Sequence, residues 1–354
     1  MIRADPDLLA GLAADPTTDL GASGAAPVRK RARAKPSTAK APERQALPPP
    51  PVPAWARASG RAGQGDPQFA AGAGLALLDA HLRRDPPGAR ALRQRLALMS
   101  AAASARILRL NADEGALRDL RFAIGDDPGP AARLLQLWRE LASRPASLDP
   151  ARIRDAAARL DCAPPDPDSL AAGLRAYVQS PDDPVSAATK AAASTFSVFP
   201  DAPAAPPEIL AHWVFDMVIA IRLGSPRPLP LIATKILDPS LRSDGGGRRT
   251  RPNEPAWSKT AAAAVALAAA SALDLAAHLS RRSDTLLAVA PKLRAKCASK
   301  IVDLLLAEDC VSPAEAARQA PMTDRAARRL FDRLLAVGAV RELTGRPAFR
   351  LFGL

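Results

Sequence analysis

The sequence contains few aromatic residues and few of the side chains that build metal or redox sites. Aromatics make up 4% of the 354 residues, and there are only three cysteines and three histidines. Cys162, Cys297 and Cys310 lie far apart and lack metal-ligand spacing, which is typical of a reduced intracellular protein. The histidines are equally isolated; they are His81, His212 and His278. The sequence therefore predicts no metal site and no cofactor.

Motifs of known enzyme classes are also missing. A Gly-rich segment, Asp244 to Arg249, lacks the Gly-Lys-Ser/Thr ending and the preceding strand of a phosphate-binding loop. The acidic pair Asp113-Glu114 stands where a helix begins, so capping explains it without catalysis. No catalytic residue is predicted. An enzyme without a recognisable motif remains a third hypothesis, behind the two given below.

The N-terminus shows no pattern of a signal peptide, because residues 1–14 contain early acids and no apolar core. The most apolar stretch, Thr260 to Leu279, is mostly alanine and contains Asp274 and His278. We expect this stretch to be a buried helix rather than a membrane span. These features predict a cytoplasmic protein with no membrane partner.

Alanine, leucine and proline are abundant. Alanine and leucine favour helices and rarely form strands, and 36 prolines divide the chain into many short helices. The predicted fold is all-α: a multi-helix body with a C-terminal winged helix-turn-helix bearing one small β-hairpin. The expected regions are a disordered basic and Pro-rich arm (1–52), an all-helical body (53–283) and the winged helix-turn-helix (284–354).

Apolar spacing and capping residues predict where the helices of the body lie. In the first helix, Phe69, Ala73, Leu77 and Leu78 share one side. The predicted helices cover residues 66–84, 89–110, 113–122, 131–143, 149–160, 168–179, 185–198, 207–223, 231–237, 257–282 and 291–308.

The C-terminal segment carries the clearest functional pattern. Ser312 to Glu315 is a capping box, in which the Ser312 hydroxyl accepts from the N3 amide and Glu315 reaches back to the N-cap amide. This helix is expected to end before Pro321, and Thr323 caps a second helix after a turn of about three residues. Gly338 suits the position that ends the second helix.

The second helix is amphipathic, with a broad apolar stripe from Ala326 to Val337. On the opposite face Arg325, Arg329 and Arg333 follow one another at intervals of four residues, with Arg328 beside them. Like charges at this spacing repel, so a helix that needed only solubility would mix signs. Asp332 is expected to pair with Arg328. For the helix taken alone, a solvated basic face is the competing interpretation.

A β-hairpin is predicted after this helix. Val340–Leu343 and Ala348–Phe352 alternate with a period of two, and Thr344–Pro347 joins them, with Gly345 free to adopt a positive φ. A winged helix-turn-helix presents its second helix to the major groove and its hairpin to the neighbouring groove or backbone. The predicted DNA-contact residues are Thr323, Arg325, Arg328, Arg329, Arg333, Arg346 and Arg350.

The net charge of +13 is concentrated at the two ends. Residues 1–65 contain ten Lys/Arg against five Asp/Glu, residues 66–280 contain 25 against 23, and residues 281–354 contain 14 against eight. A nearly neutral middle between basic ends indicates a polyanionic partner. The cluster from Arg29 to Lys35 is either a DNA-tethering arm or a solubilising tail.

Duplex DNA is therefore the predicted partner, and a transcriptional or a plasmid or chromosome-maintenance factor is the expected kind of protein. The helical body is expected to mediate self-association or to hold a protein partner. The alternative is a winged helix that docks protein or dimerises without binding DNA, because the same fold serves both purposes.

Several segments resemble a known family. They are Trp55, Phe69–Asp79, Arg93–Leu98, Thr323–Leu334 and Thr344–Leu351. Together they are similar to an uncharacterised bacterial family catalogued as domain of unknown function 1403, from about Pro53 to Leu354. The resemblance implies a bacterial protein and supplies no activity and no site residues.

Overall fold

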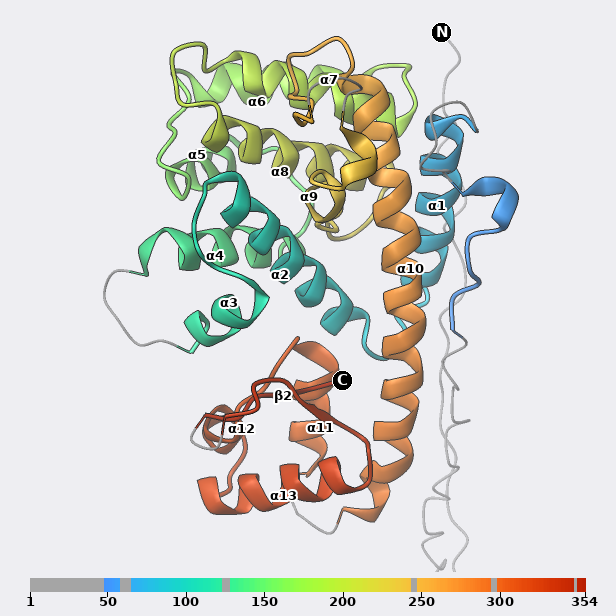
Figure 1. Ribbon diagram of the computed structural model, residues 1–354, viewed down its shortest axis with the longest axis vertical. Coiled ribbons are helices and arrows are strands. Elements are labelled where there is room, and N and C mark those ends of the chain that lie inside the picture. The colour runs from blue at the N-terminus through green and yellow to red at the C-terminus, as the bar shows by residue number, and fades with distance from the viewer. Residues whose placement is uncertain (1–47, 58–64, 123–127, 243–246, 294–297, 347–348) are drawn as a thin grey trace, which may run out of the picture. The chain divides into compact units, whose positions relative to one another are not determined.

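The computed structural model describes residues 48–354, apart from 58–64, 123–127, 243–246, 294–297 and 347–348. The described residues belong to one compact unit, Gln45–Leu354. They are mostly helical, with 65% helix and 2% strand, which confirms the predicted all-α character (Figure 1).

The predicted arm, with its Arg29–Lys35 cluster, lies almost entirely outside the described residues. Its last residue, Val52, is buried, and its carbonyl accepts a hydrogen bond from Arg57 at 2.8 Å. The packed part of the chain therefore begins before residue 53. The short 3-10 helix η1 (Ala54–Ala56) follows.

Helix α1 (Pro67–Leu82) lies along the long helix α10 (Trp257–Val289) (Figure 1). A Cβ on Gly74 would lie 2.9 Å from the Cβ of Ala269, so the two helices touch at small residues. Of the four residues predicted to share one side of α1, Leu78 is fully buried and Ala73 and Leu77 pack partly buried against the core, whereas Phe69 is 54% exposed. The close approach between α1 and alanine-rich α10 requires small residues, such as Gly74, at the point of contact.

Helix α10 is one continuous helix, and the predicted boundary at residues 283 and 284 falls inside it. By length and composition alone, residues 257–292 could cross a membrane; 56% of their most apolar window is buried inside the protein, and the core helix of a soluble protein meets the same criterion. The predicted end at residue 282 was too early because no proline or glycine interrupts the chain before Pro291.

Helix α2 (Ala89–Ile107) packs on α4 (Gly129–Ser143), and α3 (Glu114–Leu120) lies beside both. The indole N–H of Trp138, on α4, donates to the Ser104 hydroxyl of α2 at 3.0 Å. This bond satisfies the one polar atom of a fully buried aromatic side chain.

A second group of helices follows, and three of them begin in the same way. Asp149, Asp166 and Asp183 each stand before a proline at the first helical position and accept hydrogen bonds from amides of the first turn. These helices are α5 (Pro150–Ala158), α6 (Pro167–Gln179) and α7 (Pro184–Ser197). Helix α8 (Ala205–Arg222) packs against α7 and is buried along most of its length, as its apolar sequence predicts. The turns α9 (Ile232–Lys235) and η2 (Pro239–Leu241) lead towards α10.

The C-terminal region contains three helices and a small antiparallel pair. After the turn η3 (Ala290–Lys292), the elements are α11 (Ala298–Ala307), α12 (Pro313–Gln319), α13 (Asp324–Ala336), β1 (Arg341–Glu342) and β2 (Phe352–Gly353). Arg341 is paired with Gly353, and Glu342 with Phe352. The strands are shorter than predicted, and Pro347 and Ala348 of the predicted hairpin lie outside the described residues. Gly345 has a φ of +63°, as expected for the turn.

A third backbone segment joins this pair. Val311, between α11 and α12, exchanges two main-chain hydrogen bonds with Phe352, at 2.8 and 2.9 Å. The sequence did not predict this contact, because a single paired residue leaves no period-two signal.

The capping box at the start of α12 is half formed. The Ser312 hydroxyl accepts from the Glu315 amide at 3.0 Å, as predicted. The Glu315 carboxylate does not return to the N-cap and instead pairs with Arg121 at 2.8 Å. A charged partner just after the end of α3 therefore replaces the local hydrogen bond.

Candidate functional site

Helix α13 turns one face to the core and one to solvent. Thr323 caps it by accepting from the Ala326 amide at 3.3 Å, and Gly338, with a φ of +69°, follows its end. Leu330 and Phe331 are buried, and the Phe331 ring stacks on Phe352 with centroids 4.6 Å apart. This packing fixes the rotation of the helix and directs the opposite side outwards.

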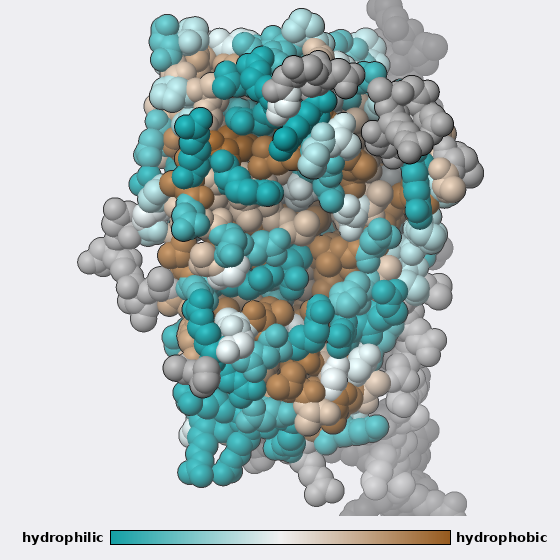
Figure 2. Space-filling view, in the orientation of Figure 1, coloured by the Kyte–Doolittle hydropathy of each residue, from teal (hydrophilic) through white to brown (hydrophobic). Residues whose placement is uncertain are grey.

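The outward side carries the arginine face, defined as Arg325, Arg329 and Arg333. All three side chains are exposed. Within the described part of the chain, none of them has an Asp or Glu oxygen within 4.0 Å. Hydrophilic residues gather over α12 and α13 at the lower end of Figure 2. Three uncompensated positive charges therefore stand one turn apart on one solvent-facing surface.

The sequence predicted an ion pair between Arg328 and Asp332, and this prediction is wrong. Its guanidinium lies 2.8 Å from Asp324, one turn earlier on the same helix. Asp332 is occupied by Arg350, 2.8 Å away on the segment that leads into β2. The tertiary fold brings this second cation close to Asp332, and no local sequence pattern predicts that contact.

The two basic residues predicted on the hairpin have partners already. Arg350 also contacts Glu342 at 2.9 Å, and its guanidinium lies 4.9 Å from the centre of the Phe352 ring. Hydrogen bonds to Glu342 and Asp332 raise the pKa of Arg350. Arg346 forms an ion pair with Asp119, next to the end of α3, at 2.6 Å. The hairpin arginines therefore differ from those of the arginine face.

The hairpin rests on the body at a second point. The Phe349 and Phe122 rings form a T-shaped pair with centroids 5.8 Å apart. Asp119 and Phe122 were not predicted as partners of the hairpin, since more than two hundred residues separate the two segments. Only the packing of the C-terminal region on α3 reveals the contact.

A network of ion pairs joins the C-terminal region to the body. Arg118 contacts Asp309 at 2.8 Å, and Arg139 contacts Glu308 at 2.7 Å. Burial lowers the pKa of Arg118, but the Asp309 charge reverses this, so the net change is a rise. The members of this ion-pair network are Arg95, Arg118, Arg121 and Arg139 from the body, and Glu308, Asp309 and Glu315 from the C-terminal region.

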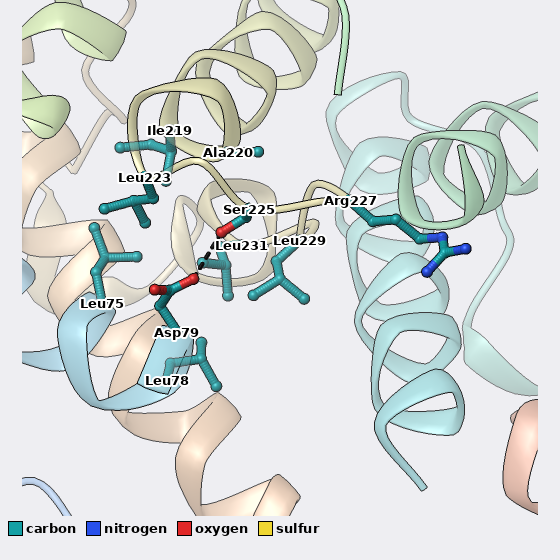
Figure 3. Close-up of a pocket in the computed structure, with 10 residues that line it drawn as sticks. All are labelled: Leu75, Leu78, Asp79, Ile219, Ala220, Leu223, Ser225, Arg227, Leu229 and Leu231. Atoms are coloured by element: carbon teal, nitrogen blue, oxygen red, sulfur yellow. Dashed lines mark hydrogen bonds between the residues drawn. The ribbon is translucent and has the colours of Figure 1, made fainter. Parts of the chain in front are cut away.

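Two hollows of the body differ in size and in the residues that line them. A cavity of about 20 Å³ between α1 and α8 has room for roughly one water molecule (Figure 3). The Ser225 hydroxyl donates to Asp79 at 2.8 Å on its wall, whereas Arg227 points away. Ser225 and Asp79 therefore satisfy one another on this wall.

A wider hollow of about 540 Å³ lies near Leu108, Cys162 and Phe199. Burial raises the pKa of the Cys162 thiol to about 12, so its reactive thiolate is disfavoured. Its two arginines, Arg133 and Arg159, are both paired with acids. Among the described residues, no group of three His, Cys, Asp or Glu side chains could hold a metal ion.

The fold and the arginine face define a mostly helical protein. Its last helix, α13, carries three exposed arginines that form no ion pair within the described residues. Residues 41–354 match the family described as "Protein of unknown function (DUF1403)", and the chain belongs to that family. The match covers all the described residues and agrees with the resemblance seen in the sequence. No curated protein matches the chain.

Proposed function

We propose that the protein binds duplex DNA through α13, with the arginine face contacting phosphates and base edges. The observation that carries this proposal is that, among the described residues, no Asp or Glu oxygen lies within 4.0 Å of the exposed Arg325, Arg329 and Arg333. The arginines of the ion-pair network between the body and the C-terminal region have acidic partners. The arginine face has no such partners in the described residues and stays positively charged.

The order of elements supports a winged helix-turn-helix. Helix α12 is followed by a short turn that ends at Thr323, then by α13, and then by a β-hairpin. Helix α11 and the paired residue Val311 precede them. In such an arrangement the second helix of the turn enters the major groove.

The dimensions of the arginine face suit a groove. From Arg325 to Arg333 the helix advances about 12 Å at a rise of about 1.5 Å per residue. That length corresponds to roughly three to four base pairs along duplex DNA. Thr323 and Arg328 stand beside this line, and we assign them supporting contacts. Arg328 would have to exchange Asp324 for a phosphate.

The hairpin is assigned a smaller share of the binding energy. Arg346 and Arg350 must leave Asp119, Asp332 or Glu342 before they can contact DNA. The gain from a new phosphate contact is then reduced by the loss of an existing ion pair. We therefore rank the three residues of the arginine face above the two hairpin arginines.

The test is binding to a mixed-sequence duplex, followed by fluorescence anisotropy as a function of salt. Each phosphate contact contributes about −0.9 to the slope of log K against log salt. Replacing Arg325, Arg329 and Arg333 by Gln should make the slope less steep by about 2.7 and lower the affinity at least about tenfold.

The control removes the same number of charges elsewhere. Arg106, Arg154 and Lys259 are exposed, and no ion pair involving them is present in the described residues. Their triple replacement by Gln should leave the slope within about one unit of the wild-type value. The proposal fails if the protein does not bind duplex DNA at low salt, or if both triple variants weaken binding equally. The arginine face would then be better explained as a protein-docking surface.

A further inference from the structure

We propose a phosphate-binding site where α10 meets β1, formed by His278, Arg281, Arg282 and Arg341. These four residues are called the α10–β1 cluster below. His278, Arg281 and Arg282 are three and four residues apart on α10, so they lie on one side of that helix. Arg341 approaches from β1, with its Nη2 atom 3.1 Å from Nε2 of His278.

Two arginines of the cluster contact main-chain oxygen atoms. Arg341 also approaches the main-chain oxygen of Leu354 at 3.3 Å, and Arg282 donates to the Gly338 carbonyl at 3.0 Å. Within the part of the chain that the structure describes, no side-chain carboxylate lies within 4.0 Å of Arg281, Arg282 or Arg341. A negative charge on Leu354 would balance one of these cations and leave two.

The pKa values of His278 and Arg341 in the cluster are lowered, whereas those of buried arginines in the ion-pair network are raised. Burial lowers the pKa of His278, and the nearby arginines 341, 282, 281 and 95 lower it further. Burial and the neighbouring Arg282 and Arg95 also lower the pKa of Arg341. Arg95 shares the counter-ion Asp309 with Arg118, which reduces the net charge that Arg95 adds. In the ion-pair network, acids raise the pKa of buried arginines instead.

A phosphate group is the ligand that this chemistry fits. Guanidinium groups offer several N–H donors in a planar fork that matches phosphate oxygens. His278 now presents an unprotonated nitrogen to Arg341, because that nitrogen lies opposite an N–H donor. An anion among these cations would offset their repulsion and allow His278 to take up a proton and donate as well.

The cluster adjoins the proposed DNA-binding helix. Gly338, which accepts from Arg282, stands two residues after the end of α13. The phosphate can therefore come from the backbone of the duplex that α13 contacts, or it can be a free phosphate. The first source rests on the proposed function and the second does not.

The first experiment uses inorganic phosphate and the full chain labelled with ¹³C-histidine, and follows the pKa of His278 by NMR. His278→Asn assigns the signal. At constant ionic strength, phosphate should raise the pKa of His278 by about 1. The double variant Arg281→Gln/Arg282→Gln should abolish the rise, and in the absence of phosphate it should show a higher His278 pKa than the wild type. Arg106→Gln/Arg154→Gln should behave as the wild type.

The second experiment measures the salt dependence of duplex binding for the same two double variants. Loss of two backbone contacts should make the slope of log K against log salt less steep by about 1.8 in Arg281→Gln/Arg282→Gln, and the control should be unchanged. A phosphate-induced rise without this change supports the cluster with free phosphate as its source. The same rise in a protein that fails to bind DNA refutes the proposed function and supports the cluster. If neither the pKa nor the slope responds, the cluster proposal is overturned.

Discussion

Three ionisable side chains, Glu208, His212 and Asp216, follow one another at four-residue intervals along the buried helix α8. Two of them have partners. The Glu208 carboxylate accepts two hydrogen bonds from Arg249, at 2.6 and 2.5 Å, and Asp216 accepts from the amides of Leu231 and Ile232. Burial raises the pKa of Asp216 well above its usual range.

His212 is different, because neither ring nitrogen has a hydrogen-bond partner in the described residues. Its ring stacks on Trp257, with centroids 5.9 Å apart. Burial lowers the pKa of His212 to about 4, so it is neutral inside the fold. A neutral imidazole with two unsatisfied nitrogens costs stability, which a hydrocarbon ring of similar shape would not.

We expect His212→Phe to change the dependence of stability on pH. As pH falls from about 6.5 towards 4, the unfolded state binds a proton at this position and the folded wild type does not. The wild type should therefore keep its full stability above about pH 6.5 and lose stability as pH falls through that window. The loss should reach about 3 kcal/mol at the lower end of the window. His212→Phe should lose less than the wild type over the same window. Urea unfolding at several pH values measures the difference.

At neutral pH the same variant should be as stable as the wild type or more stable by about 1 kcal/mol, since two unpaired nitrogens are removed. Subtracting the two pH profiles cancels the contributions of His81 and His278. Parallel profiles between pH 4 and 6.5 would show that His212 titrates normally, contrary to its burial.

At the scale of elements, the contact between α1 and α10 depends on which glycine faces the partner helix. Gly74 lies against Ala269, whereas Gly72, two residues earlier on α1, has no neighbouring atom within 4 Å of an added Cβ. The same substitution at these two positions separates helix propensity from packing.

Gly72→Ala should stabilise the protein by about 0.4–1 kcal/mol, because alanine restricts the unfolded chain and fits the helix. Gly74→Ala gains the same term but places a methyl group 2.9 Å from the Ala269 Cβ, which forces the helices apart at a cost of about 1–3 kcal/mol. Thermal unfolding should therefore rank Gly72→Ala above the wild type and Gly74→Ala at or below it. Equal gains would mean that α1 and α10 can separate freely.

At the scale of the whole molecule, the ion-pair network anchors the C-terminal region to the body. Asp309 is its centre: it is 5% exposed and accepts hydrogen bonds from both Arg95 and Arg118. Removing one member of a buried pair leaves the other charge uncompensated, which costs more than the pair contributes.

Asp309→Asn should therefore loosen the C-terminal region selectively. We expect a loss of about 2–3 kcal/mol, seen as amide hydrogen exchange about 30- to 150-fold faster in α11–α13. Exchange in α7 and α8 should change much less. Asp332→Asn, which breaks the exposed pair with Arg350, is the control and should cost less than about 1 kcal/mol. Equal acceleration in α7, α8 and α13 would show that the region does not open separately.

The sequence by itself determined the elements and their polarity. Asp149, Asp183 and Thr323 announce helix starts through local capping, and the four-residue spacing of Arg325, Arg329 and Arg333 places them on one face. These features are predictable because they depend on neighbours within one or two helical turns. The alternation near the C-terminus likewise located the hairpin, although its strands are shorter than expected.

Only the tertiary structure decided which charges are compensated. Arg346 is neutralised by Asp119, Arg350 by Asp332 and Glu342, and Arg328 by Asp324, while the arginine face and the α10–β1 cluster lack acids in the described residues. The reason is the short range of the ion pair: it forms only where packing brings two groups within about 4 Å. Residues 119 and 346, or 278 and 341, meet through that packing alone. The number of charges can be read from the sequence, whereas the partner of each charge depends on the fold.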